Sequence, residues 1–155
     1  MKFIVTKELG RLARWLRILG FDTIYFKSDN KATLILIALR EDRFIVTRSK
    51  YKRQGLKKKT IELSSNELKL QLKELIKTLD LKIEEKRMFT RCTLCNEELV
   101  EVGKQEVQNL VPEYVYETQK AFMKCPSCNK IYWQGSHWGK VSEVVSKLVN
   151  WRLEN

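Results

Sequence analysis

Apolar residues in the first part of the chain recur with two different spacings. Short apolar or β-branched runs, typical of buried strands, alternate with longer segments in which apolar positions recur every three or four residues, as in amphipathic helices. The predicted strands are Phe3–Thr6, Thr23–Phe26, Phe44–Thr47 and Thr60–Leu63. The predicted helices are Glu8–Leu19, Lys31–Arg40 and Glu67–Leu79. This alternation indicates an α/β fold with a small parallel sheet flanked by helices, and ligands are expected at the carboxyl ends of the strands.

The first predicted helix has two chemically different faces. At about 100° per residue, its apolar residues gather on one side and its arginines gather on the other. The apolar set is Leu9, Leu12, Ala13, Leu16 and Leu19, and the basic set is Arg11, Arg14 and Arg17. A solvated face is the ordinary interpretation of such a stripe, whereas its place directly after a strand favours a binding role.

The regular pattern stops in the mixed charged run 80–87. We therefore expect an α/β domain at residues 1–87 and a second module at residues 88–155, which ends in an amphipathic helix over Val141–Leu153. No apolar run is long enough to cross a membrane, and the first seven residues are too soon charged for a signal peptide. A cytoplasmic location is the resulting expectation.

Charge is distributed unevenly between these two parts. The chain has a formal net charge of +11. Residues 1–87 contain 22 lysines and arginines against 11 acidic residues, whereas residues 88–155 contain eight of each. A concentrated positive charge favours a polyanion partner, with nucleic acid as the first candidate. A membrane surface is disfavoured, because no segment combines a basic face with a large exposed apolar face.

Four cysteines form two Cys-x-x-Cys motifs in the second module, Cys92–Cys95 and Cys125–Cys128. Each motif can direct two thiolates at one ion, and two motifs complete the closed tetrahedral site of structural zinc. The 29 residues between the motifs exceed the usual spacing, so an enlarged hairpin or loop is expected over 97–124. Asn96 and Asn129, which follow the motifs, tolerate the positive φ of such turns. Two matched pairs in one module disfavour a redox pair.

The remaining chemistry-bearing residues of this module lie in the segment 132–138. His137 is the only histidine, and it is either an ordinary loop residue or a contact to a substrate phosphate or base. Tyr132, Trp133 and Trp138 could stack on nucleobases. The interpretation we prefer is that these aromatic residues form the small core of the module.

Several motifs together resemble one known family. They are Leu9-Gly-Arg-Leu-Ala-Arg-Trp-Leu-Arg-Ile-Leu-Gly-Phe-Asp22, Val46-Thr-Arg-Ser49, the two cysteine motifs, and Tyr132-Trp-Gln-Gly-Ser-His137. They look like the Mut-seven carboxyl-terminal ribonuclease domain family, and the resemblance runs from Phe3 to about Trp138. It implies a PIN-like nuclease fold joined to a zinc ribbon, RNA as the partner, and a metal-dependent endoribonuclease reaction with Mg²⁺ or Mn²⁺.

The sequence departs from that family at two acidic positions, which here are Thr6 and Ser49. Nucleases of this fold gather carboxylates around divalent ions at the carboxyl ends of the strands. The remaining candidate acid is Asp29, which could equally cap the following helix, as could Asn30. Asp22 is a weaker candidate, and Glu8 could return a carboxylate to the pocket. The alternative hypothesis is a catalytically inactive RNA-binding protein that retains the zinc ribbon.

Basic residues next to the strand ends are predicted to contact RNA phosphates along one rim of this pocket. The first helix and the 50–59 loop both begin where a strand ends, so they open on the same edge of the sheet. The predicted contacts are Arg11, Arg14, Arg17, Arg48, Lys50, Lys52, Arg53, Lys57, Lys58 and Lys59, with His137 as a further candidate.

Overall fold

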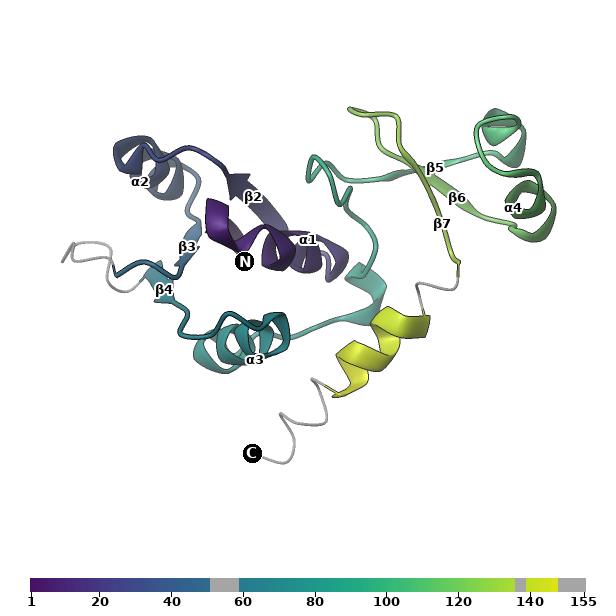
Figure 1. Cartoon of the computed structure of the whole chain (residues 1–155). Coiled ribbons are helices and arrows are strands. Elements are labelled where there is room, and N and C mark those ends of the chain that lie inside the picture. The colour runs from purple at the N-terminus through teal and green to yellow at the C-terminus, as the bar shows by residue number, and fades with distance from the viewer. Residues whose placement is uncertain (51–58, 136–138, 148–155) are drawn as a thin grey trace. The chain divides into compact units, whose positions relative to one another are not determined.

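Four parallel strands form the sheet of the first unit (Figure 1). They are β1 (Lys2–Thr6), β2 (Asp22–Phe26), β3 (Phe44–Thr47) and β4 (Thr60–Glu62), in the order β2-β1-β3-β4. The central strand β1 pairs with both β2 and β3, so that Ile4 lies beside Ile24 and Ile45. Its residues Phe3, Ile4 and Val5 are completely buried. The predicted small parallel sheet is confirmed.

In the computed structural model, residues 1–50, 59–135 and 139–147 are described. The chain divides into two units, Met1–Phe89 and Thr90–Asn155. The predicted boundary lay two residues earlier, after Arg87. The first unit continues to Phe89 because the Phe89 N–H donates a hydrogen bond to Ile18 O (2.7 Å).

Three α-helices flank the sheet of this unit: α1 (Gly10–Ile18), α2 (Lys31–Arg40) and α3 (Leu68–Leu79). Helix α2 packs on one face through Leu34, Ile35 and Ala38, which meet Ile4 and Ile45. Side chains alternate along a strand, so the neighbours of Ile4 point to the opposite face. Helix α1 packs against β1, β2 and α3. The sheet core is therefore covered by helices, as the pattern predicted.

The segment between β1 and α1 is a short 3-10 helix, η1 (Lys7–Leu9), rather than the first turn of the predicted α-helix. After α1, Gly20 adopts a positive φ of +87°, and a Cβ there would lie 2.1 Å from Arg87 O. Only glycine fits this close approach. The Arg87 backbone belongs to a second 3-10 helix, η3 (Glu85–Arg87).

The second unit contains a three-stranded antiparallel sheet of β5 (Val100–Val102), β6 (Phe122–Lys124) and β7 (Ile131–Trp133), in that order. The expected enlarged hairpin between the cysteine motifs includes β5 and β6. It also contains two helices, η4 (Lys104–Val107) and α4 (Glu113–Thr118). Their residues Val107 and Val115 pack on the buried Phe122. Residues 139–147 are helical, so this helix begins two residues before the predicted terminal helix Val141–Leu153. No described helix has both the length and the apolar character needed to cross a membrane.

Candidate functional sites

The two cysteine motifs form turns with the same hydrogen-bonding pattern. The Cys92 N–H donates to Glu97 O (2.8 Å), and the Cys125 N–H donates to Lys130 O (2.9 Å). The residue after each motif, Asn96 or Asn129, has a positive φ of 74° or 60°. Asparagine tolerates this conformation better than most residues. The two turns therefore present their sulfur atoms in matching ways.

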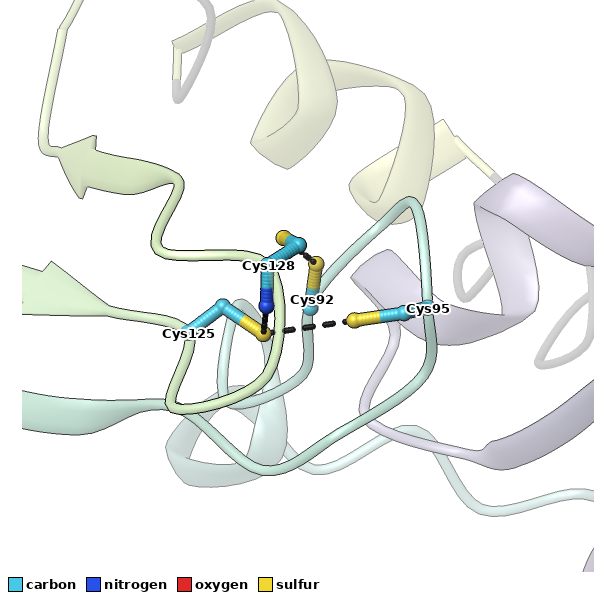
Figure 2. A group of neighbouring side chains, drawn as sticks. All are labelled: Cys92, Cys95, Cys125 and Cys128. Atoms are coloured by element: carbon cyan, nitrogen blue, oxygen red, sulfur yellow. Dashed lines mark hydrogen bonds between the residues drawn. The ribbon is translucent and has the colours of Figure 1, made fainter.

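All four cysteine sulfur atoms lie within 4.8 Å of one another (Figure 2). Across the two turns, Cys95 Sγ lies 3.2 Å from Cys125 Sγ, and Cys92 Sγ lies 3.6 Å from Cys128 Sγ. A tetrahedral ion with sulfur ligands at about 2.3 Å requires sulfur separations of about 3.8 Å. None of the four cysteines forms a disulfide. These four residues could therefore hold one metal ion, with no ligand position left open.

Tyr132 on β7 belongs to this cluster, although its sequence position indicates no such role. Its hydroxyl lies 3.1 Å from Cys92 Sγ and accepts a hydrogen bond from the Thr93 N–H (3.1 Å). Burial raises the pKa of Cys92, but the hydrogen bond from Tyr132 and those from backbone N–H groups outweigh it and lower that pKa to about 6. Burial and the Cys125 thiol raise the pKa of Cys95 to about 12. Metal binding must therefore release protons.

The aromatic residues of β7 pack against other residues of the second unit. Trp133 packs against the cluster of Val107, Val115 and Phe122, and Tyr132 contacts the first cysteine turn. These contacts support the interpretation of a small core. Trp138 and His137 lie outside the described residues.

A separate cavity of about 90 Å³ lies at the carboxyl ends of strands β1 and β3 in the first unit. It is lined by the start of η1, the segment between β2 and α2, and the end of β3. The lining residues are Thr6, Lys7, Glu8, Phe26, Ser28, Asp29, Lys31, Leu34, Thr47 and Ser49. This strand-end pocket brings together two candidate acids, Glu8 and Asp29, and the two positions that lack an acid, Thr6 and Ser49.

The Glu8 carboxylate is held at the pocket by three donors. Its Oε1 accepts hydrogen bonds from Thr6 Oγ1 (2.6 Å), Thr47 Oγ1 (3.2 Å) and the Arg48 N–H (3.0 Å). Partial burial raises the pKa of Glu8, but these hydrogen bonds outweigh it and lower the pKa below its ordinary value of 4.5. Glu8 is therefore ionised at neutral pH. The hydroxyl groups of Thr6 and Thr47 thus hold the carboxylate of Glu8, which lies two residues after Thr6.

Asp29 lies in the same pocket and is paired with Lys7. Lys7 Nζ lies 2.6 Å from Asp29 Oδ1 and 2.8 Å from Asp29 Oδ2. The hydrogen bond that Lys7 donates to Asp29 raises the pKa of Lys7, so this amine stays protonated. Asp29 does not cap helix α2, because Asn30 Oδ1 accepts the Thr33 N–H (3.1 Å). The alternative role of Asp29 as a helix cap is therefore wrong.

The donor set of the pocket fits a divalent ion that shares its coordination with substrate. Mg²⁺ commonly binds through one or two carboxylates, with waters and phosphate oxygens as its other ligands. Glu8 and Asp29 supply two carboxylates. Among the described residues, the only group of three or more acidic, histidine or cysteine ligands is the cysteine cluster. The pocket by itself is therefore a weaker site than a full acidic cluster.

Asp22 lies at the opposite edge of the sheet, at the start of β2, where it pairs with Lys2 of β1. Its carboxylate binds the buried Arg43, with Asp22 Oδ1 2.7 Å from Arg43 Nη1. The same guanidinium donates to Phe3 O (3.2 Å) and to Glu41. Asp22 therefore helps to join the amino-terminal ends of the strands. The structure corrects its predicted place in the strand-end pocket.

Helix α1 buries its apolar face as predicted, but its arginines do not act as one stripe. Arg11 and Arg14 are exposed. Arg17 is only 7% exposed, and its Nε donates to Thr23 O (2.9 Å). The structure corrects the prediction that Arg17 lines the rim, because its side chain is used inside the unit. The helix turns far enough over six residues to bring its last arginine back toward the sheet.

The cations after β3 also separate into different places. Arg48 and Lys50 are exposed just after the carboxyl end of β3. Lys59 instead precedes Thr60, which pairs with Ile45 near the start of β3. It forms an ion pair with Asp42 at that edge, so its predicted place on the rim is corrected. The predicted contacts Lys52, Arg53, Lys57 and Lys58 lie outside the described residues.

Comparison with known proteins gives one family match. The model of the family described as the Mut7-C RNAse domain matches residues 1–145, which includes the strand-end pocket and all four cysteines. No curated protein matches this sequence closely enough to be counted as a relative. The chain therefore belongs to the Mut7-C RNAse domain family.

Proposed function

We propose that this protein binds RNA at its strand-end pocket and hydrolyses it with Mg²⁺ or Mn²⁺, using a reduced set of acids. The observation that carries the proposal is the position of Glu8. Its carboxylate is held ionised at the carboxyl ends of β1 and β3, in the same cavity as Asp29. Glu8 thus supplies a carboxylate to a pocket in which Thr6 and Ser49 stand at the two positions where the family has acidic residues.

Glu8 and Asp29 are the residues that would hold the divalent ion. When bound, such an ion neutralises phosphate charge and lowers the pKa of a water molecule, which can then attack the phosphorus. Glu8 suits this task because three donors fix one of its oxygens, Oε1. The hydroxyl groups of Thr47 and Thr6 orient the carboxylate and keep it ionised.

The exposed cations of the first unit support RNA as the partner. Arg48 and Lys50 follow the end of β3, and Arg11 and Arg14 lie on the helix that follows β1 and η1. Each cation that neutralises a phosphate releases counterions, so RNA affinity should fall steeply with salt. The ribonuclease family is the argument for RNA over DNA, because charge alone does not distinguish them.

For the cysteine cluster we propose a structural Zn²⁺. Four thiolates in tetrahedral reach of one another form a closed site, which is typical of zinc ribbons. The small apolar core of this unit supports a stabilising role for the ion. Zinc would hold the second unit together and take no part in hydrolysis.

A second candidate function is RNA binding without hydrolysis. The observation that favours it is the ion pair between Lys7 and Asp29, which leaves Glu8 as the only pocket carboxylate that is not neutralised by a cation. The hydroxyls of Thr6 and Ser49 add no negative charge. This candidate keeps the basic surface and the zinc module.

A cleavage assay distinguishes the two candidates. End-labelled single-stranded and structured RNAs are incubated with zinc-loaded protein, with no added ion, with Mg²⁺ or with Mn²⁺, and zinc content is measured throughout. Hydrolysis is expected only with an added ion, and both Glu8→Gln and Asp29→Asn should lower its rate at least tenfold. Glu67→Gln, which removes an exposed acid outside the pocket, should leave the rate unchanged.

Binding without any ion-dependent cleavage would support the second candidate. Cleavage that survives in the double variant Glu8→Gln/Asp29→Asn would place the reaction elsewhere or assign it to a contaminant.

A further inference from the structure

Lys7 occupies the position from which a cation can control the charge of the strand-end pocket. Its ammonium contacts both oxygens of Asp29, at 2.6 and 2.8 Å. Its backbone is fixed, because Lys7 O accepts a hydrogen bond from the Tyr25 hydroxyl (2.7 Å). The side chain therefore extends from an anchored backbone, and both Lys7 and Asp29 line the cavity.

This ion pair is exchangeable. The Lys7 side chain is 54% exposed and that of Asp29 is 83% exposed. Ion pairs between exposed groups contribute little net free energy, since water and salt screen them. An incoming anion or cation can therefore replace either partner without breaking the fold.

The pair also affects metal binding. An ammonium on both oxygens of Asp29 competes directly with a divalent cation for the same atoms. With Asp29 occupied, Glu8 is the only other carboxylate of the pocket. The free protein should therefore bind a divalent ion weakly.

We infer that Lys7 is a phosphate-binding residue that holds Asp29 in the free protein and releases it when it pairs with an RNA phosphate. This inference rests on the function proposed above. The same phosphate that draws Lys7 away can supply a further oxygen ligand to the ion. RNA and the divalent ion then bind cooperatively, and each raises the affinity of the pocket for the other by the same factor.

Direct measurement of Mn²⁺ binding tests this coupling without any cleavage. Free Mn²⁺ is followed by electron paramagnetic resonance in zinc-loaded full-length protein, with and without a 2′-O-methyl RNA oligonucleotide that resists cleavage. The oligonucleotide alone corrects for Mn²⁺ that RNA binds by itself. For the parent protein, RNA should tighten Mn²⁺ binding by roughly five- to tenfold.

Lys7→Met should release Asp29 permanently. Without RNA, this variant should bind Mn²⁺ about five- to tenfold more tightly than the parent, and addition of RNA should tighten it little further. Its RNA affinity in the absence of Mn²⁺ should fall. Asp29→Asn should lose the coupling and bind Mn²⁺ weakly under both conditions.

Lys27→Met is the matched control, because it removes the same charge two residues before Asp29. Lys27 lies over the Tyr25 ring, 5.6 Å from its centroid, and lies outside the lining of the pocket. Its Mn²⁺ affinity without RNA should stay within about twofold of the parent. Equal Mn²⁺ tightening in Lys7→Met and Lys27→Met would show only a general charge effect and would overturn the inference.

Three further results separate this inference from the proposed function. Unchanged Mn²⁺ affinity in Lys7→Met, in a protein that cleaves RNA, overturns the inference alone. RNA-dependent Mn²⁺ binding that depends on Lys7, in a protein that cleaves nothing, supports the inference and overturns hydrolysis. No Mn²⁺ binding with or without RNA overturns both. A thermal transition within 2–3 °C of the parent, a shift of about 1 kcal/mol or less, confirms that each variant is folded.

Discussion

The two units of this chain differ in their apolar cores and in their candidate metal ligands. In Met1–Phe89, helices cover a parallel sheet whose central strand is completely buried, and the core is built from aliphatic and aromatic side chains. In Thr90–Asn155, two short helices pack Val107 and Val115 on Phe122 of a three-stranded sheet, and four cysteine sulfurs converge elsewhere in the unit. The first unit thus has the larger apolar core, whereas the second has four cysteines that could hold a metal ion.

The distribution of charge follows the same division. All the excess positive charge lies in residues 1–87, and the rest of the chain is neutral. A unit with a large apolar core can tolerate the self-repulsion of many exposed cations. Under the functions proposed above, the first unit would provide the RNA-binding surface, and a structural metal ion would hold the second. The following experiments test this division.

Removal of one cysteine should unfold the second unit and spare the first. In small zinc domains, metal binding supplies about 10–16 kcal/mol, which is also the free energy of folding. Cys125→Ser should therefore lose bound zinc and the amide-exchange protection of residues 90–135, while residues 1–50 keep theirs. Ser127→Ala, in the same turn but exposed, should retain both. Full protection in metal-free Cys125→Ser would refute the dependence on metal.

A cavity in the core of the first unit should have the converse effect. Leu16 on α1 is completely buried, so Leu16→Ala should lower the free energy of unfolding of this unit by about 2–5 kcal/mol. Leu36→Ala is the matched control, since Leu36 is 65% exposed, and it should change stability by less than about 0.5 kcal/mol. Urea denaturation, followed by residue-specific amide hydrogen exchange, distinguishes the unfolding of the two units. Zinc removal should leave the Leu16→Ala effect unchanged.

Substitutions of two arginines on helix α1 should have different effects, one on the stability of the first unit and the other on RNA binding. Arg17 is buried and donates to Thr23 O, so Arg17→Gln should destabilise the first unit by about 1–3 kcal/mol and leave the salt dependence of RNA binding intact. Arg14 is exposed, and Arg14→Gln should reduce the slope of log affinity against log salt by about 0.7 for single-stranded RNA. If both variants changed that slope equally, the buried position of Arg17 would not hold in solution.

Glu8 should make a small, pH-dependent contribution to the stability of the first unit. Its pKa is lowered below 4.5 in the folded state. This contribution is therefore complete above about pH 5 and is lost as the pH falls through the folded pKa. The group is exposed, so solvent screening limits the effect to at most about 1 kcal/mol. The stability difference between the parent and Glu8→Gln should shrink as the pH falls from 6 to 3.

Hydrophobic pattern was enough to predict the elements of the first unit. Strands β1 to β4 and helix α2 appear within a residue or two of their expected bounds. Short apolar runs are typical of buried strands, and apolar spacing of three or four residues is typical of amphipathic helices. The pattern could not show that the first turn after β1 is a 3-10 helix. Glu8 lies in this 3-10 helix, and its carboxylate accepts a hydrogen bond from the Thr6 hydroxyl.

The candidate sites divide in the same way. Cysteine spacing predicted the cluster in full, since metal geometry leaves little freedom to two Cys-x-x-Cys turns. Tyr132 was missed as part of that cluster, because its contact with Cys92 joins residues 40 positions apart. Asp22 and Lys59 were expected at the pocket, but both lie where strands begin. Sequence distance from a motif does not tell which edge of the sheet a residue reaches.

The amino-acid sequence by itself determined the fold class, the excess charge of the first 87 residues and the cysteine cluster. Each depends on composition or on spacing along the chain. Tertiary structure alone decided that Arg17 is buried and that Glu8 and Lys7 share a pocket with Asp29. Those outcomes depend on which side chains meet across parallel strands. The physical reason is that hydrogen bonds and ion pairs act through space, between atoms that only the packed sheet brings together.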